Sequence, residues 1–262
     1  MNIVFLDLDG TVIGSNGVSE RTWSACEALR PTHHLVVCTG RTGSGVALEI
    51  AKRLAPNGVH IFENGGFICR ATGEVLFESA LDPQDIETMI SHAEGVDATL
   101  EFYTAAGVFS NRQHPDCDEH ARVLEIEVLA ADLREVARNH RVIRAHWIMR
   151  PEGVDAALDF ELQNSERGVA SSPVLPLNVF ASVTAKGVSK GSAAKWVADY
   201  LDIPLEKTWA VGDAESDRPV LEVVAHPRVM GDSPASLLRD FERLGMVDDD
   251  GLADFLETLM PQ

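Results

Sequence analysis

Two pairs of carboxylates stand out in this chain. Asp7 and Asp9 are one residue apart directly after an apolar run, and Asp213 and Asp217 follow a second apolar run near the end of the sequence. Close, ionised carboxylates repel each other unless a cation or a shared proton holds them. A divalent-metal site is therefore one interpretation of Asp7 and Asp9. An ordinary turn is the other, because Asp and the following Gly10 both favour turns, and this stretch alone does not separate the two.

Residues suited to a phosphate group follow other apolar runs. Thr39 and Gly40 come directly after one run, and Asn64 comes two residues after another. A threonine hydroxyl and loop amides can donate hydrogen bonds to phosphoryl oxygens. Each of these positions is a weak signal, because Thr39 alone is better explained as a strand-end hydroxyl. Together with the carboxylates, they predict a binding site for a phosphorylated molecule.

A lysine completes the set. Lys190 follows Ser189, a residue type that often caps a helix, at the start of an amphipathic segment. The first turn of a helix points its N–H groups at an anion, so a lysine there adds a positive charge where an anion already binds. For this reason Lys190 is preferred over Lys186 and Lys195 as the phosphate-binding lysine.

The set supplies what phosphoryl transfer requires. A phosphomonoester is an anion that repels an attacking carboxylate, and a hard cation with oxygen ligands, here expected to be Mg²⁺, lowers that barrier. Asp7, Asp213 and a backbone carbonyl near Asp9 are the expected metal ligands. Lys190 and Thr39 would stabilise the transferring group. One aspartate would attack phosphorus and another would protonate the leaving alcohol.

The apolar runs and the helical segments between them predict an α/β fold, which would position these residues. Short, continuous apolar runs are typical of strands buried on both faces of a parallel sheet. Capped or amphipathic helical segments separate most of the runs. We expect a Rossmann-like, doubly wound parallel sheet with strand order 3-2-1-4-5, in which the carboxyl ends of the strands meet at one edge. The five predicted strands are 3–6, 35–38, 59–62, 208–211 and 228–230.

The middle third of the chain follows another pattern. Its apolar runs are shorter and alternate with polar residues, as in Thr99–Tyr103, which favours antiparallel strands with one solvated face. We expect an α+β cap domain inserted into the first domain, so that residues 1–81 and 187–262 form the core and 82–186 the cap. The expected cap helices start at Asp82-Pro83 and span 129–139 and 153–163, and further strands span 142–149 and 176–183.

Composition limits the classes of partner. The net charge of −19 argues against a nucleic-acid partner, because phosphate backbones are held by a surplus of Lys and Arg. No signal-like segment and no run of about 18 apolar residues is present, so we expect a cytoplasmic protein without a membrane anchor. The four cysteines are far apart and form no Cys-x-x-Cys pair. We expect a monomer or a homodimer.

Two further features have alternative interpretations. His114, Cys117 and His120 have a three-residue spacing that could place them on one helix face as zinc ligands. No fourth ligand is evident, so an incidental, solvated group is favoured. Arg41 could contact the cap or a substrate carboxylate, or form a surface salt bridge, with little to choose between these roles.

The motif Asp7-Leu8-Asp9-Gly10-Thr11 resembles the haloacid dehalogenase (HAD) superfamily of phosphohydrolases. The inserted segment is similar to the branch with a large α/β cap, the Cof-like or subclass IIB sugar phosphatases. The turn Glu63–Gly66 also resembles that of the mannosyl-3-phosphoglycerate phosphatases. Serine stands at position 216, where many relatives have asparagine, which puts a metal or substrate contact from that position in doubt.

The resemblance implies specific roles. Asp7 would be the nucleophile, and Asp9 the general acid and base whose backbone carbonyl binds Mg²⁺. Asp213 would be a metal ligand, and Asp217 would bind the metal through water or anchor Lys190. Thr39, Gly40, Asn64 and Lys190 would bind the substrate and its phosphate.

The sequence thus predicts a Mg²⁺-dependent phosphatase that acts through an aspartyl-phosphate. We expect its substrate to be a small phosphorylated metabolite, a sugar phosphate or a phosphoglycerate derivative. A phosphomutase on the same core, or a non-catalytic sensor of a phosphorylated ligand, are the alternatives. No motif in the cap identifies the substrate.

Overall fold

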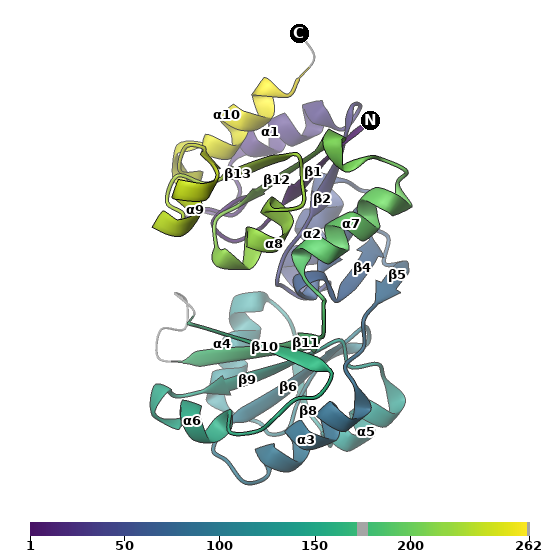
Figure 1. The fold of residues 1–262 in the computed structure, drawn as a ribbon, viewed down its shortest axis with the longest axis vertical. Helices are drawn as coiled ribbons and strands as arrows, with labels where there is room; N and C mark the ends of the chain where they lie inside the picture. Colours follow the sequence, from purple (N-terminus) through teal and green to yellow (C-terminus); the bar gives the residue numbers. More distant parts are fainter. Residues whose placement is uncertain (172–177, 261–262) are drawn as a thin grey trace. The chain divides into compact units, whose positions relative to one another are not determined.

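The computed structural model describes residues 1–171 and 178–260, which form two compact units (Figure 1). The first unit, here called the core, contains Met1–Gly43, Ala47–Phe77 and Ser189–Gln262. The second unit, here called the cap, contains Ser44–Val46 and Glu78–Val188. Within the described residues, no helix combines the length and the apolar character that crossing a membrane requires.

The core is built on a parallel sheet with strand order β14-β13-β12-β1-β2. An isolated parallel bridge between Cys38 and Ile61 continues this order to β3. The predicted order 3-2-1-4-5 is therefore confirmed, with β14 added beyond the last predicted strand. The strands are β1 (Asn2–Leu6), β2 (His33–Val37), β3 (Val59–Phe62), β12 (Thr208–Gly212), β13 (His226–Val229) and β14 (Glu242–Arg243).

Helices cover both faces of the core sheet, as a doubly wound fold requires. On one face, α7 and α8 pack against a cluster that includes Ile3 and Phe5 of β1. On the other face, α1 contacts α10, and Arg53 of α2 lies over the ring of Trp23 in α1. The core helices are α1 (Glu20–Leu29), α2 (Gly45–Leu54), α7 (Lys190–Tyr200), α8 (Arg218–Leu221), α9 (Ala235–Asp240) and α10 (Gly251–Thr258). A hairpin of β4 (Phe67–Arg70) and β5 (Val75–Glu78), which the sequence did not predict, follows β3.

The cap contains a mostly antiparallel sheet with strand order β10-β11-β9-β6-β7-β8. Among the described residues, the β7–β8 pair is parallel and the other pairs of this sheet are antiparallel. Helices α3 and α5 pack on one face of this sheet, against Leu100, Phe102 and Trp147. The cap strands are β6 (Thr99–Thr104), β7 (Gly107–Ser110), β8 (Val128–Ala130), β9 (Arg144–Met149), β10 (Ser165–Ser171) and β11 (Val179–Ala185). The cap helices are α3 (Pro83–Ala93), α4 (Pro115–Leu124), α5 (Leu133–Asn139) and α6 (Val154–Ala157).

Two predicted cap helices are wrong in extent. The segment 129–139 begins as strand β8, and α5 starts only after Asp132, whose side chain accepts hydrogen bonds from the N–H groups of Arg134 and Glu135. The segment 153–163 is helical only in α6. Part of the predicted strand 176–183 lies outside the described residues, and β11 begins at Val179.

A long-range contact explains why the helical segment 153–163 is cut short. Asp85 in α3 is fully buried, and its two carboxylate oxygens accept hydrogen bonds from the backbone N–H groups of Gln163 (2.8 Å) and Asn164 (2.9 Å). A continued helix would use these N–H groups for its own backbone ladder. Asp85 therefore holds this segment in its non-helical path before β10.

We expect Asp85→Ala to lower the free energy of unfolding by roughly 1–3 kcal/mol, because two partly buried hydrogen bonds from backbone N–H groups lose their charged acceptor. Urea unfolding followed by circular dichroism measures this change. The exposed Asp155 of α6 offers a matched control, and Asp155→Ala should stay within about 0.5 kcal/mol of the wild type. Equal effects of the two substitutions would contradict this account of the segment.

Candidate active site

A buried lysine joins the two carboxylate pairs at the ends of β1 and β12. Lys190 is 2% exposed, and its Nζ donates hydrogen bonds to Oδ1 of Asp7 (2.8 Å) and Oδ1 of Asp217 (2.6 Å). Lys190 is the first residue of α7, where the side chains and backbones of Ser189 and Ser192 form a reciprocal capping box. The cap fixes where α7 begins, and with it the position of the ammonium group.

Asp217 uses both of its carboxylate oxygens within the protein. Oδ1 accepts from Lys190, and Oδ2 accepts from the backbone N–H groups of Asp213 (3.0 Å) and Ala214 (3.1 Å). A fully buried carboxylate is stable only when its charge and hydrogen-bond capacity are met in this way. This arrangement favours Asp217 as the anchor of Lys190 over a direct metal ligand.

Asp213 offers oxygen atoms that the protein leaves unused. Carboxylate oxygens of Asp7, Asp213 and Asp217 lie within 4.8 Å of one another. Oδ1 of Asp213 is buried and has no hydrogen-bond partner among the described residues. Gly10 has a φ of +74°, and a Cβ there would lie 2.4 Å from Oδ2 of Asp213, so only glycine lets the two segments approach this closely. An all-oxygen donor set with an unpaired buried oxygen fits a hard cation such as Mg²⁺.

The charge balance of the acidic group formed by Asp7, Asp213 and Asp217 also favours a bound cation. Burial, followed by the charge of Asp217, raises the pKa of Asp7 to about 8, although Lys190 opposes the shift. Burial and the same neighbour raise the pKa of Asp213 to about 6. Burial disfavours the charge of Lys190, but Asp217 and Asp7 outweigh it and raise the lysine pKa. One ammonium does not compensate three carboxylates, and a divalent cation would favour their ionised forms.

Thr39, Gly40 and Asn64 lie together at the ends of β2 and β3. The backbone N–H of Asn64 donates to the carbonyl of Thr39 (3.1 Å), and a Cβ on Gly40 would lie 2.8 Å from Oδ1 of Asn64. The Thr39 hydroxyl accepts a hydrogen bond from the N–H of Arg41 (3.2 Å). Asn64 has a φ of +54°, a left-handed conformation that Asn tolerates better than most residues.

The Asn64 turn packs directly against the start of α7. Gly65 has a φ of +103°, and a Cβ there would lie 2.3 Å from the carbonyl oxygen of Ser189, so any side chain would force the two segments apart. Ser189 is the residue before Lys190, and the backbone N–H of Asn64 donates a hydrogen bond to the carbonyl of Thr39. The predicted phosphate-binding residues are therefore linked to the acidic group through backbone contacts within the core.

The side chain of Asp9 has a different partner from Asp7. Arg41 donates two hydrogen bonds to it, from Nε to Oδ2 (2.8 Å) and from Nη2 to Oδ1 (2.6 Å). The Asp9 side chain is 57% exposed, against 9% for Asp7. Of the roles left open for Arg41 by the sequence, this structure shows the salt bridge. The pairing had no sequence signal beyond the position of Arg41 two residues after Thr39.

The structure thus brings Asp7, Lys190, Asp213 and Asp217 into one buried group and joins Thr39, Gly40 and Asn64 beside it. It does not bring the Asp9 carboxylate into the acidic group. Ser216 is exposed, at the turn between Asp213 and Asp217.

Comparison with known proteins gives consistent matches over nearly the whole chain. The family model for haloacid dehalogenase-like hydrolases matches residues 4–256. A Streptococcus pyogenes protein named "Putative phosphatase M6_Spy0533" is 31% identical over 88% of this chain and 87% of its own length. The HMP-PP phosphatase of an Enterobacter species is 24% identical over 92% of this chain and 88% of its own length. Among solved structures, the HAD subclass IIB sugar phosphatase BT4131 superposes with a TM-score of 0.83 at 21% identity, covering 99% of both chains.

The raised pKa of Asp7 predicts how stability depends on pH without metal. Its pKa is 3.8 in its ordinary state and about 8 in the fold, so the folded protein keeps a proton that the unfolded chain releases. The contribution of Asp7 to the free energy of unfolding is therefore largest at low pH and decreases between about pH 4 and pH 8. In EDTA, we expect Asp7→Asn to become more stable relative to wild type as pH rises from about 5 to about 8. Urea unfolding at several pH values measures the difference.

A parallel series in excess Mg²⁺ is the control for this prediction. Metal ligands must be deprotonated, so wild type should gain more stability from Mg²⁺ at higher pH. A difference between Asp7→Asn and wild type that stays constant with pH in EDTA would contradict the effect of burial on Asp7.

Proposed function

The chain belongs to the haloacid dehalogenase-like hydrolases, and on this basis we propose that it is a Mg²⁺-dependent phosphatase acting through an aspartyl-phosphate. The observation that carries the proposal is the buried contact of Lys190 with Asp7 and Asp217, beside the unpaired oxygen of Asp213. This arrangement places one fixed carboxylate, one positive charge and a hard-cation donor set at the ends of neighbouring strands.

In the first step, Asp7 attacks phosphorus. The hydrogen bond from Lys190 to Oδ1 holds the Asp7 carboxylate, so Oδ2 is the oxygen that forms the new bond. The bond from phosphorus to the substrate oxygen breaks, and Asp9 gives the leaving oxygen the proton that it accepted from water in the preceding turnover. Lys190, the Thr39 hydroxyl and the neighbouring loop amides then stabilise the charge on the phosphoryl oxygens.

Asp7, Asp213 and the backbone carbonyl of Asp9 would hold Mg²⁺. When bound, the ion reduces the repulsion between the carboxylate and the phosphoryl group. Asp217 holds Lys190 and the turn after β12, and so acts as a positioning residue.

In the second step, the ionised Asp9 accepts a proton from water, and the water oxygen attacks phosphorus. The bond between phosphorus and Oδ2 of Asp7 breaks, phosphate leaves and Asp7 is restored. Asp9 is bonded to Arg41 in this structure, so the pair must open before Asp9 can serve the leaving group. The Asp9 side chain is 57% exposed, so water can solvate its carboxylate when the pair opens.

The substrate is proposed to be a small phosphorylated metabolite, a sugar phosphate or a phosphoglycerate derivative. The sugar phosphatase fold match and the phosphatase names of the sequence relatives support this class. A net charge of −19 offers no long-range attraction to an anion, so the phosphate must be held by local groups such as Lys190.

The test is phosphate release from a panel of sugar phosphates, phosphoglycerates, nucleotides and phosphorylated cofactors. We expect wild type to release phosphate with Mg²⁺ and to stop in EDTA. Asp7→Asn should lower kcat by at least about 1,000-fold, because it removes the nucleophile. Asp213→Asn should weaken the response to Mg²⁺, and the exposed Asp249→Asn should retain wild-type turnover.

Other outcomes would identify the alternatives. Phosphoryl return to a sugar without phosphate release would identify a phosphomutase. Binding of a phosphorylated ligand by a folded protein without any turnover would identify a sensor. Full activity of Asp7→Asn would contradict the assignment of the nucleophile.

A further inference from the structure

A second buried polar group lies in the cap, on the sheet face opposite the apolar cluster. Glu101 of β6 and His146 of β9 are direct partners in the antiparallel register, and both are buried. Side chains alternate along a strand, so Leu100 and Phe102 enter the apolar cluster while Glu101 points to the other face. Directly opposed residues have neighbouring Cβ atoms, which brings the carboxylate and the imidazole together.

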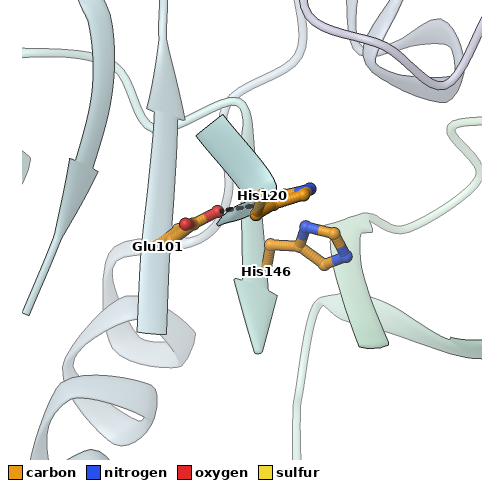
Figure 2. A group of neighbouring side chains, drawn as sticks. All are labelled: Glu101, His120 and His146. Carbon is orange, nitrogen blue, oxygen red and sulfur yellow. Dashed lines mark hydrogen bonds and ion pairs between the residues drawn. The ribbon is translucent and has the colours of Figure 1, made fainter. Parts of the chain in front are cut away.

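Helix α4 adds a third side chain to this pair. His120 is 7% exposed, and its Nδ1 lies 3.1 Å from Oε2 of Glu101. Polar atoms of Glu101, His120 and His146, one from each residue, all lie within 4.8 Å of one another. Figure 2 shows the three side chains gathered between the strands and the helix.

The hydrogen-bonding contacts of Tyr103 and His120 meet only one oxygen of Glu101. Oε2 accepts from the Tyr103 hydroxyl (2.8 Å) and contacts His120. Oε1 is buried and has no hydrogen-bond partner among the described residues, although Glu101 has no exposed surface. The buried thiol of Cys117 also lies beside Glu101, but a thiol is only a weak hydrogen-bond donor. The Glu101 carboxylate therefore keeps the capacity to bind a stronger partner, since a buried carboxylate is costly without one.

We propose that Glu101, His120 and His146 bind a Zn²⁺-class transition-metal ion. Two imidazoles and one carboxylate form a ligand set that Zn²⁺ accepts, with a fourth position left for water. With Zn–ligand bonds of about 2.0–2.1 Å, tetrahedral ligand atoms are roughly 3.3 Å apart. The contact between His120 and Glu101 already has that spacing, and small side-chain rotations would bring in His146.

Neighbouring groups either support or oppose this ion. The Tyr103 hydroxyl orients the Glu101 carboxylate and lies 3.4 Å from Nδ1 of His146. The Arg144 guanidinium stacks on the Tyr103 ring, 4.1 Å from its centroid, and its positive charge opposes a cation. The charge of Glu101 is therefore essential to the proposed site.

This group differs in chemistry from the acidic group of the core. The core group presents only oxygen atoms, which suit Mg²⁺, whereas the cap group presents two nitrogens and one oxygen. Metal binding in the cap would tie α4 to β6 and β9. The proposal does not depend on the proposed phosphatase activity.

The cap group also corrects an interpretation from the sequence. The spacing of His114, Cys117 and His120 favoured an incidental, solvated group, but Cys117 is 3% and His120 is 7% exposed. The partners of His120 are Glu101, 19 residues earlier, and His146, rather than two neighbours on its own helix.

Co²⁺ titration of the full-length protein in excess Mg²⁺ tests the proposal. Mg²⁺ occupies oxygen sites, and Co²⁺ in a four-coordinate nitrogen and oxygen site gives intense visible absorption, whereas six-coordinate Co²⁺ absorbs weakly. We expect wild type to show the intense bands with one equivalent of Co²⁺ and to lose them when Zn²⁺ is added. His120→Ala and His146→Ala should each weaken binding by on the order of 100-fold or more.

Two variants control for other binding sites. His140→Ala removes an exposed cap histidine, and Asp213→Asn alters the core group, so both should keep the wild-type bands. Circular dichroism checks that each variant is folded. If a histidine variant fails to fold, Glu101→Gln keeps the side-chain size and decides the question through loss of the bands.

Only weak six-coordinate absorption in wild type would overturn the proposal. Intense bands that persist in the folded histidine variants, or in Glu101→Gln, would overturn it as well.

Discussion

The core depends most on the buried ion pairs that the Lys190 ammonium forms. The ammonium pairs with Asp7 after β1 and Asp217 after β12, while Asp217 also accepts the backbone N–H of Asp213. A buried charge is tolerated only when partners compensate it, and removing one partner of such a set costs about 3–5 kcal/mol. Chemistry and fold are therefore linked at this point: the same contacts that orient the proposed nucleophile also hold α7 against the strand ends.

The acidic group of the core and the Glu101, His120 and His146 group of the cap are made differently. In the core, parallel strands bring their carboxyl ends to one edge, so residues distant in sequence meet just beyond the strands. In the cap, Glu101 and His146 meet within the strands, through antiparallel register, and α4 supplies His120. Each group leaves one buried carboxylate oxygen without a partner among the described residues. We interpret both groups as proposed metal sites, with oxygen-only donors in the core and mixed nitrogen and oxygen donors in the cap.

The sequence predicts the core well because its signals are local. Short apolar runs followed by polar residues identify the strands and, through parallel topology, the meeting of Asp7 with Asp213, while Ser189 as a helix cap indicates Lys190. Features that depend on distant contacts were not predictable in this way. The carboxylate of Asp85 shortens a helix about 70 residues later in the chain, and no local pattern marks that contact. The pairing of Asp9 with Arg41 and the register that joins Glu101 to His146 likewise depend on the folded arrangement.

In the proposed reaction, Asp7 itself receives the phosphoryl group. Acid quenching of wild type during turnover, followed by proteolysis and mass spectrometry, tests this most directly because an acyl phosphate survives brief exposure to acid. We expect a phosphoryl group on Asp7 that is lost on treatment with hydroxylamine. A phosphoryl group on another residue, or an unmodified Asp7 in every sample quenched while the enzyme releases phosphate, would contradict the assignment of Asp7 as the nucleophile.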